Sequence, residues 1–126
     1  MEAICKLKYQ RYARTKISRL VDQVRGKNLF EAEHMLNALN SSSKTVVKKA
    51  IKSAGANLSI KLGRKIDLKN VWIKQVYADQ GPMKSLRRFN AGPQGRAMPF
   101  TRAMCHLTVV VSDSRPACRS LGAGRE

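Results

Sequence analysis

Apolar residues recur with the spacing of one helical face in three segments of the chain, at about residues 13–25, 29–39 and 44–62. The positions that this spacing predicts to be buried are Ile17, Leu20, Val21, Val24, Ala32, Met35, Leu36, Leu39, Val47, Ala50, Ile51, Ala54 and Leu58. Gly26 and Gly63 follow the first and third segments, as glycine often does where a helix ends. The pattern therefore predicts three amphipathic helices.

Strand-like patterns lie on either side of these helices. Residues 3–9 alternate loosely between apolar and polar side chains, and residues 67–79 and 104–112 are rich in β-branched and aromatic residues. The apolar members of the first run are Ala3, Cys5, Leu7 and Tyr9. A strand, three helices and two further strands predict an α+β fold in which three helices pack on a small three-stranded antiparallel sheet.

The segment between the last two predicted strands is long, basic and free of acidic residues. No Asp or Glu lies between Asp79 and Asp113, and the central Gly92-Pro93-Gln94-Gly95 has the composition of a β-turn. Loops longer than roughly 12–15 residues are usually functional or disordered. We therefore expect residues of about 80–103 to form a long, extended β-hairpin arm that becomes ordered on a polyanionic partner.

The chain carries a large positive charge. Lys and Arg number 25 against 8 Asp and Glu, a net charge of +17, which favours a polyanionic partner. The cations occur in the N-terminal segment, the third helix and the arm. Those of the third helix are expected to lie opposite its apolar face and to be unpaired, since no acidic residue lies between Glu33 and Asp67. This spread suits a protein surrounded by the phosphates of a folded RNA. The candidate RNA-binding residues are Lys8, Arg11, Arg14, Lys16, Arg19, Arg25, Lys27, Lys44, Lys48, Lys49, Lys52, Lys84, Arg87, Arg88, Arg96 and Arg102.

Length and composition indicate one domain without catalytic chemistry. We expect a single domain over residues 1–113 and a flexible, Gly/Arg/Ser-rich tail over residues 114–126. Cys5, Cys105 and Cys118 form no CxxC pair, so reduced thiols, as in a cytosolic protein, and no bound metal are expected. The scattered acidic residues and two histidines form no catalytic pattern, which argues against an enzyme and calls for no cofactor.

Two other functions are compatible with the charge. A basic DNA-binding or chromatin-like protein would account for the cations and for a helix pair over residues 15–39, but it leaves the arm without a role. A secreted, cationic, membrane-active protein is the other. The sequence lacks a signal-peptide pattern and has no apolar run near the roughly 20 residues of a spanning helix, so we expect no membrane partner.

Five groups of short motifs occur in the order and spacing of one known family. They are Val24-Arg25-Gly26-Lys27 with Glu31-Ala32, Ser53-Ala54 with Ala56-Asn57, Val76 to Pro82, Gln94-Gly95-Arg96-Ala97, and His106 to Val111. Together they resemble the large-ribosomal-subunit protein twenty-two family, a universal family, in its bacterial form. The resemblance covers residues 3–113.

This resemblance implies three helices on a three-stranded antiparallel sheet and a structural role in the large ribosomal subunit of the cytoplasm. The implied partners are large-subunit rRNA, bound early in assembly, neighbouring large-subunit ribosomal proteins, and the nascent polypeptide. The arm would line the nascent-peptide exit tunnel near the region where macrolides bind. The tunnel-lining tip would consist of Arg88, Asn90, Gly92, Pro93, Gln94, Gly95 and Arg96.

The chain also departs from the family pattern. Ala13-Arg14 replaces the usual Ser-Pro at the first helix, and the outgoing arm is slightly longer before Gln94. The returning arm over residues 98–104 has fewer cations than is common, so Arg102 is the only basic residue expected to contact RNA on that side. The tail after Asp113 has no counterpart in the family.

Overall fold

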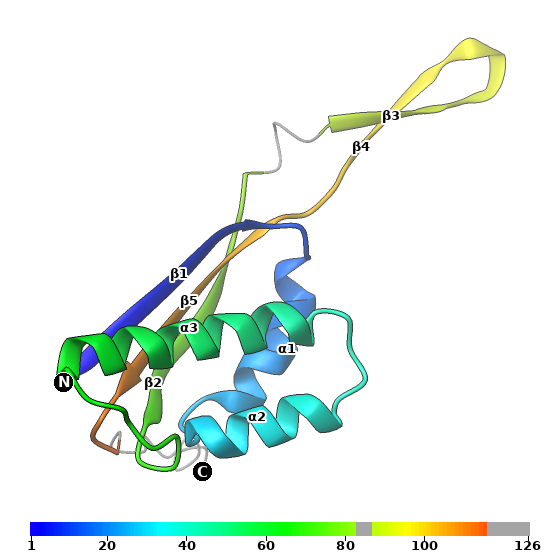
Figure 1. The fold of residues 1–126 in the computed structure, drawn as a ribbon. Coiled ribbons are helices and arrows are strands. Elements are labelled where there is room, and N and C mark those ends of the chain that lie inside the picture. The colour runs from blue at the N-terminus through cyan, green and yellow to red at the C-terminus, as the bar shows by residue number, and fades with distance from the viewer. Residues whose placement is uncertain (83–86, 116–126) are drawn as a thin grey trace, which may run out of the picture.

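Three helices form a layer on one face of a small antiparallel sheet, and a two-stranded ribbon projects from one end of that sheet (Figure 1). The computed structural model describes residues 1–82 and 87–115. In chain order the elements are β1 (Glu2–Gln10), α1 (Arg14–Val24), α2 (Leu29–Ala38), α3 (Lys44–Leu62), β2 (Trp72–Gln80), β3 (Arg87–Ala91), β4 (Ala97–Thr101) and β5 (Cys105–Ser112). The sheet has the order β1-β5-β2, with β5 antiparallel to both neighbours, and β3 pairs with β4 separately.

The predicted α+β fold is confirmed, with a small difference in the sheets. All three helices begin and end within one residue of their predicted bounds. The arm contains two regular strands of its own, so the described chain has five strands in two sheets. The predicted tail is described only at its first two residues, Ser114 and Arg115; the rest of that prediction falls outside the described residues.

The core lies between the helices and the sheet and is aliphatic. Of the helical positions predicted to be buried, only Met35 and Leu39 are half-buried, and all the others are enclosed. Gly26 and Gly63 have left-handed φ values of 75° and 65° at the ends of α1 and α3. Glycine adopts this conformation without the steric penalty of a Cβ, which explains both helix ends.

Two of the three cysteines belong to this core. Cys5 and Cys105 are buried free thiols, and Cys118 lies outside the described residues. Burial raises the pKa of the Cys105 thiol, and a hydrogen bond with the backbone of Tyr12 offsets part of this effect. The Cys105 Sγ–H points to the carbonyl oxygen of Gln10 at 3.9 Å. The thiol is therefore held in its protonated, unreactive form.

Strand β1 contains one residue more than β5 near the arm. Leu7 pairs with Leu107, but both Lys8 and Tyr9 then lie opposite His106 alone, which defines a β-bulge. Tyr9 has a left-handed φ of 56°. The alternation of Ala3, Cys5 and Leu7 toward the core therefore does not extend to Tyr9, because the bulge turns Tyr9 outward and leaves it 59% exposed.

Candidate nucleic-acid interface

The arm is a ribbon exposed on both faces. β3 and β4 pair in continuous register, from Arg87 opposite Thr101 to Ala91 opposite Ala97. Every residue of the two strands is exposed except the half-buried Phe100. Because so isolated a ribbon has no apolar core of its own, its side chains are available for contact along its whole length.

The tip of the arm is a tight turn that depends on glycine. The Gly92 N–H donates to the Arg96 carbonyl oxygen at 2.7 Å, and a Cβ on Gly92 would lie 2.8 Å from the same oxygen. Gln94 and Gly95 have left-handed φ values of 56° and 70°. The Arg96 N–H donates to the Pro93 carbonyl oxygen at 3.3 Å, so Pro93 is the first residue of the turn and Gln94 and Gly95 are its two central residues. A turn is present at the predicted place, but it begins at Pro93 and not at Gly92, so the predicted positions of Pro93 and Gly95 in it are wrong.

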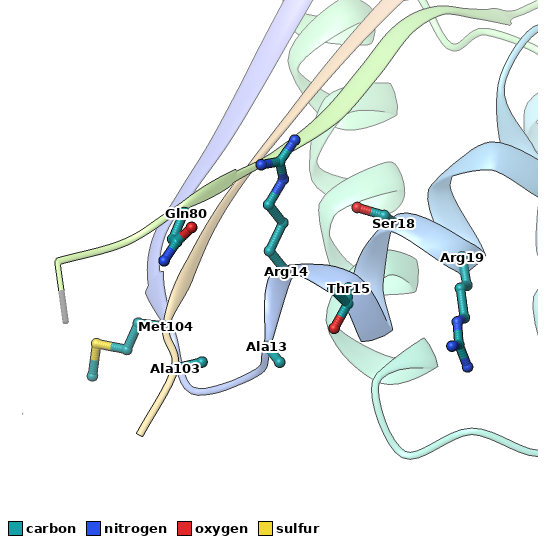
Figure 2. Close-up of a pocket in the computed structure, with 8 residues that line it drawn as sticks. All are labelled: Ala13, Arg14, Thr15, Ser18, Arg19, Gln80, Ala103 and Met104. Atoms are coloured by element: carbon teal, nitrogen blue, oxygen red, sulfur yellow. The ribbon is translucent and has the colours of Figure 1, made fainter. Parts of the chain in front are cut away.

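A cavity of about 560 Å³ lies at the root of the arm, where α1 begins. The Gly81 N–H donates to the Met104 carbonyl oxygen at 2.8 Å and joins the two legs of the arm here. The residues that line the cavity are Ala13, Arg14, Thr15, Ser18, Arg19, Gln80, Ala103 and Met104 (Figure 2). The cavity thus brings the start of a helix and the base of the arm together.

Positive charge surrounds the start of α1 in this cavity. Ala13 occupies the N-cap position and provides no side-chain cap, and the first turn contains no acidic residue. Uncapped N–H groups at a helix start favour an anion. The side chains of Arg14 and Arg19 extend away from each other in Figure 2. The two arginines therefore add positive charge at the edge of the cavity without converging on one point.

Two of the candidate lysines on α3 contact the end of α2. Lys44 Nζ donates to the Leu39 carbonyl oxygen and Lys48 Nζ donates to Asn37 Oδ1, each at 2.8 Å. Both lysines are half-buried. The expectation that they lie opposite the core without partners is wrong. Cations near the last carbonyl groups of a helix stabilise that end, so these two lysines fasten α2 to α3.

Three other candidate RNA-binding residues also contact or are partly covered by neighbouring parts of the protein. Lys52 Nζ lies 3.7 Å from Glu33 Oε1, so the prediction that it is unpaired is wrong. Arg25 Nη2 lies 3.4 Å from Asp22 Oδ1, and Lys27 is half-buried. Arg25 Nη2 also donates to the Val76 carbonyl oxygen of β2 at 3.2 Å, so Arg25 is partly engaged with the fold. A solvent-exposed pair such as Lys52–Glu33 contributes little to stability, so Lys52 keeps most of its capacity to bind an anion.

The remaining described candidates are exposed. They are Lys8, Arg11, Arg14, Lys16, Arg19, Lys49, Arg87, Arg88, Arg96 and Arg102. The tip residues predicted to line a tunnel are exposed as well, apart from the half-buried Gly92. Lys84 lies outside the described residues. The structure gathers Arg14 and Arg19 at the arm root and the arm arginines along the ribbon, whereas Lys49 lies apart on α3.

Sequence reasoning missed two groups of exposed residues. Arg64, Lys65 and Lys69 lie in the loop between α3 and β2 and are exposed. Their clustering after the glycine that ends the helix could have identified them as candidate RNA-binding residues from the sequence. Tyr9 and Tyr77 are exposed on the sheet. The outward position of Tyr9 depends on the bulge in β1, and no periodicity in the sequence reveals that bulge.

The described surface has a large excess of positive charge. Only three ion pairs form among the described residues, so most of the exposed cations there are balanced by solvent ions. Release of such ions to a polyanion favours binding. None of the described helices is long and apolar enough to cross a membrane.

Comparison with known proteins gives one consistent match. Residues 5–112, from β1 to the end of β5, match the family model of ribosomal protein L22p/L17e. The large ribosomal subunit protein uL22 of Syntrophus aciditrophicus is 37% identical over 113 residues, which cover 90% of this chain and 99% of that protein. The uL22 proteins of Bdellovibrio bacteriovorus and Clostridium novyi are 37% and 38% identical over 113 residues, 90% of this chain and 99% and 98% of theirs. The chain therefore belongs to the ribosomal protein L22p/L17e family.

Proposed function

We propose that the protein is a structural constituent of the large ribosomal subunit in the cytoplasm, where it binds large-subunit rRNA and lines the nascent-peptide exit tunnel with its arm. The observation that carries this proposal is the β3–β4 ribbon. It projects from the sheet and contains no acidic residue. It exposes Arg87 and Arg88 on β3, and Arg96 at the turn and Arg102 after β4 are exposed as well. An element of this kind gains its order from a surrounding polyanion rather than from a core.

The globular part supplies the attachment to rRNA. Exposed cations lie on β1, on α1, around the arm-root cavity and in the loop after α3. Contacts on several sides suit a folded RNA, which is recognised largely through its shape and backbone. Such contacts hold separate RNA segments together, which supports a role early in subunit assembly and places neighbouring ribosomal proteins against the remaining surface.

The length of the arm supports a role inside the tunnel. At about 3.3 Å per residue, a leg of a dozen residues reaches roughly 40 Å. The tip, residues 88–96, would then lie far from the globular part, with its exposed side chains toward the nascent polypeptide. This position would bring the tip near the region where macrolides bind.

Two measurements test the rRNA-binding role. Filter binding of the protein to large-subunit rRNA fragments should show a steep salt dependence, with each phosphate contact contributing roughly 0.7–0.9 to the log–log slope. In cell lysates at moderate salt the protein should sediment with large subunits, and ribonuclease treatment should release it. A slope near zero, or sedimentation with DNA instead, would favour the DNA-binding alternative.

A further inference from the structure

One face of the three-stranded sheet carries no helix. Leu107, Val109 and Val111 of β5 are buried under the helices, so alternation along the strand places His106 and Thr108 on the opposite face. In the described parts of the chain all three helices lie on the first side (Figure 1). No described helix covers the second side, and its exposed side chains come mainly from the outer strands β1 and β2, because Thr108 and Val110 of β5 are buried there.

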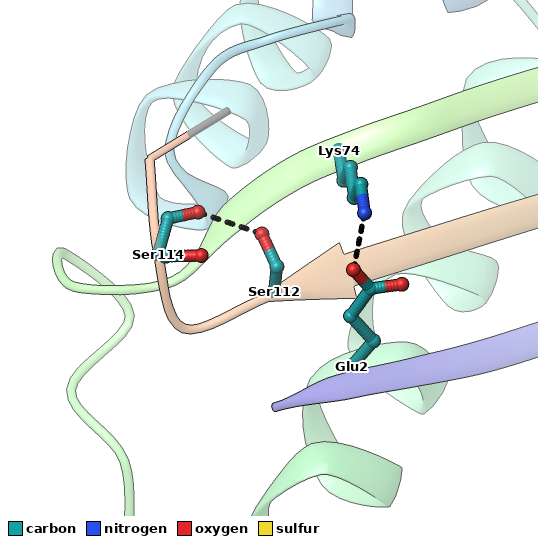
Figure 3. A network of polar contacts seen from close by, with 4 residues as sticks. All are labelled: Glu2, Lys74, Ser112 and Ser114. Atoms are coloured by element: carbon teal, nitrogen blue, oxygen red, sulfur yellow. Dashed lines mark hydrogen bonds and ion pairs between the residues drawn. The ribbon is translucent and has the colours of Figure 1, made fainter. Parts of the chain in front are cut away.

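In the half of this face that is remote from the arm, side chains already interact with other residues of the protein. Lys74 and Glu2 form an ion pair that spans the central strand β5 (Figure 3). The Ser112 hydroxyl lies 2.7 Å from the Ser114 carbonyl oxygen, to which it donates. The guanidinium of Arg115 lies 5.2 Å from the centre of the Trp72 ring. Partner binding is therefore expected at the other half, next to the arm.

The half near the arm exposes two tyrosines on the two outer strands. Tyr9 of β1 is 59% exposed and Tyr77 of β2 is 42% exposed. Tyr77 lies opposite Thr108 on β5, and the Tyr9 ring contacts the His106 ring two residues away. Since neighbouring strands are about 4.8 Å apart, the two tyrosines lie on strands about 10 Å apart.

Tyr9 is held in its outward position by His106. The Tyr9 N–H donates to His106 Nδ1 at 3.0 Å. The two rings meet edge to face, with centroids 4.9 Å apart and an interplanar angle of 89°. A left-handed φ is unfavourable for a tyrosine and persists only where surrounding contacts enforce it. The bulge therefore places Tyr9 in an unfavourable backbone conformation, and the contacts with His106 hold its ring in a fixed, solvent-exposed position.

The charge beside these rings points to a nucleic acid. Lys6 lies opposite Thr108 on this face, and Lys8 is the other residue of the bulge. One carboxylate, Asp79 of β2, lies opposite His106, so the two lysines leave a net positive charge beside the rings. Both lysines are exposed, and neither forms an ion pair with a described residue. Exposed aromatic rings on an open antiparallel sheet, flanked by cations, are suited to stack unpaired bases and to contact the adjoining phosphates.

We propose that this half of the sheet binds an unpaired stretch of RNA, with bases stacked on Tyr9 and Tyr77 and phosphates contacted by Lys6 and Lys8. His106 is a positioning residue that fixes Tyr9. The proposal rests on the rRNA-binding function proposed above and adds a specific site and the single-stranded form of its ligand.

The test compares single-stranded with double-stranded RNA. Full-length protein is titrated by fluorescence anisotropy with a labelled 12-nucleotide oligo(A) and with a 12-base-pair RNA duplex. The double variant Tyr9→Leu/Tyr77→Leu should bind the single strand at least tenfold more weakly, because each stacked base contributes substantially to affinity. Its salt slope and its duplex affinity should not change, since all cations are retained.

Matched variants separate stacking from general effects. Tyr9→Phe/Tyr77→Phe keeps both rings and should bind the oligo(A) within about twofold of the wild type. Phe30→Leu removes an aromatic ring that is 40% exposed on α2, and it should leave both affinities unchanged. If circular dichroism shows that Tyr9→Leu alters folding, the oligo(A) affinity of the single variant Tyr77→Leu tests the proposal instead. Tyr77 lies in paired β2 and has no unusual φ, so its replacement should not disturb the backbone.

Three outcomes would contradict the proposed stacking site or the function on which it rests. Unchanged oligo(A) affinity in the leucine double variant overturns the stacking site. Unchanged RNA affinity together with weaker retention in reconstituted subunits assigns this face to a protein partner and also overturns it. If the wild type binds neither RNA with salt-dependent affinity, the proposed rRNA-binding function itself fails.

Discussion

At the scale of single residues, Cys105 shows how the core controls chemistry. Its side chain is fully buried, and burial raises the pKa of the thiol above the ordinary value of 9.0. Folding therefore favours the protonated thiol, whereas the unfolded chain releases the proton at the ordinary pKa. Stability linked to Cys105 is fully present below that value and is lost as the pH rises above it.

We expect this linkage to appear in unfolding experiments. The free energy of unfolding of the wild type, relative to Cys105→Ala, should be nearly constant from pH 7 to just below the ordinary thiol pKa of 9.0 and should fall at higher pH, by up to about 1.4 kcal/mol per pH unit. Urea denaturation at a series of pH values measures this difference. A difference that stays constant up to pH 10 would show that the thiol ionises equally well in the folded protein.

At the scale of elements, α3 divides its lysines between two tasks. Lys44 and Lys48 reach the end of α2, whereas Lys49 points into solvent. The first two add hydrogen bonds at a helix C-terminus, and the third adds charge to the surface. We therefore expect effects on stability and effects on the proposed RNA binding to be separable on neighbouring turns of this helix.

A pair of alanine variants tests this division. Lys44→Ala should reduce the free energy of unfolding by about 1 kcal/mol, because a hydrogen bond to a helix end is lost. Lys49→Ala should change stability by less than about 0.5 kcal/mol but should lower the salt slope of rRNA binding by roughly 0.7–0.9. Urea denaturation and filter binding give the two readouts. Equal destabilisation by both variants would contradict the division.

The arm should behave as a separate element before it meets RNA. An isolated two-stranded hairpin is at best marginally stable in water, and the ribbon has no core. In hydrogen exchange of the free protein, the amides of Ile51, Ala54 and Val109 should be protected and that of Gln94 should exchange rapidly. Slow exchange at Asn90 and Met98, which are paired within the ribbon, would contradict this expectation.

Helices with a regular spacing of apolar residues were predictable from the sequence, whereas individual side-chain contacts and the β-bulge were not. The 3-1-3 spacing and the two glycines defined α1 and α3 because helix packing requires that spacing. Lys44 and Lys48 lie at the border of the buried face of α3, and periodicity cannot show which border α2 covers. In the sequence, Tyr9 continues the apolar–polar alternation of β1. In the structure, the extra residue of the bulge moves its side chain to the opposite face of the sheet.

The interface was predictable to a similar degree. Exposure of the arm arginines followed from the length of an acid-free segment with a turn at its centre. The partners of Lys52 and Arg25 depend on tertiary contacts and on a neighbouring helical turn, so charge alone did not identify them. The arm-root cavity combines residues of α1 with those of β2 and the returning leg, which only the fold brings together.

At the scale of the whole molecule, the proposed function gives the globular part and the arm different tasks. Most of the described exposed cations lie outside the arm, so the globular part should provide most of the affinity for rRNA. The arm should instead shape the tunnel. Shortening the arm is therefore expected to alter tunnel behaviour much more than assembly.

A shortened arm tests this expectation. Replacement of residues 89–99 by Asn-Gly, a good hairpin turn, keeps Arg88 and Phe100 as the closing pair and removes one cation, Arg96. Incorporation into large subunits should persist, while macrolide sensitivity and arrest by stalling peptides should change. Arg96→Ala, which keeps the arm length, is the matched control. Lost incorporation with a normal drug response would make the arm an anchor.

The position of β5 in the centre of the sheet also sets the order in which the fold can be completed. Among the strands of this sheet, β1 and β2 pair with β5 and not with each other, although both are synthesised before it. A nascent chain that has not reached Cys105 thus contains two strands without the central strand that joins them and helices without a finished sheet to pack on. Synthesis of the arm comes before closure of the sheet, so the element proposed to enter the tunnel is made before the domain that carries it can fold.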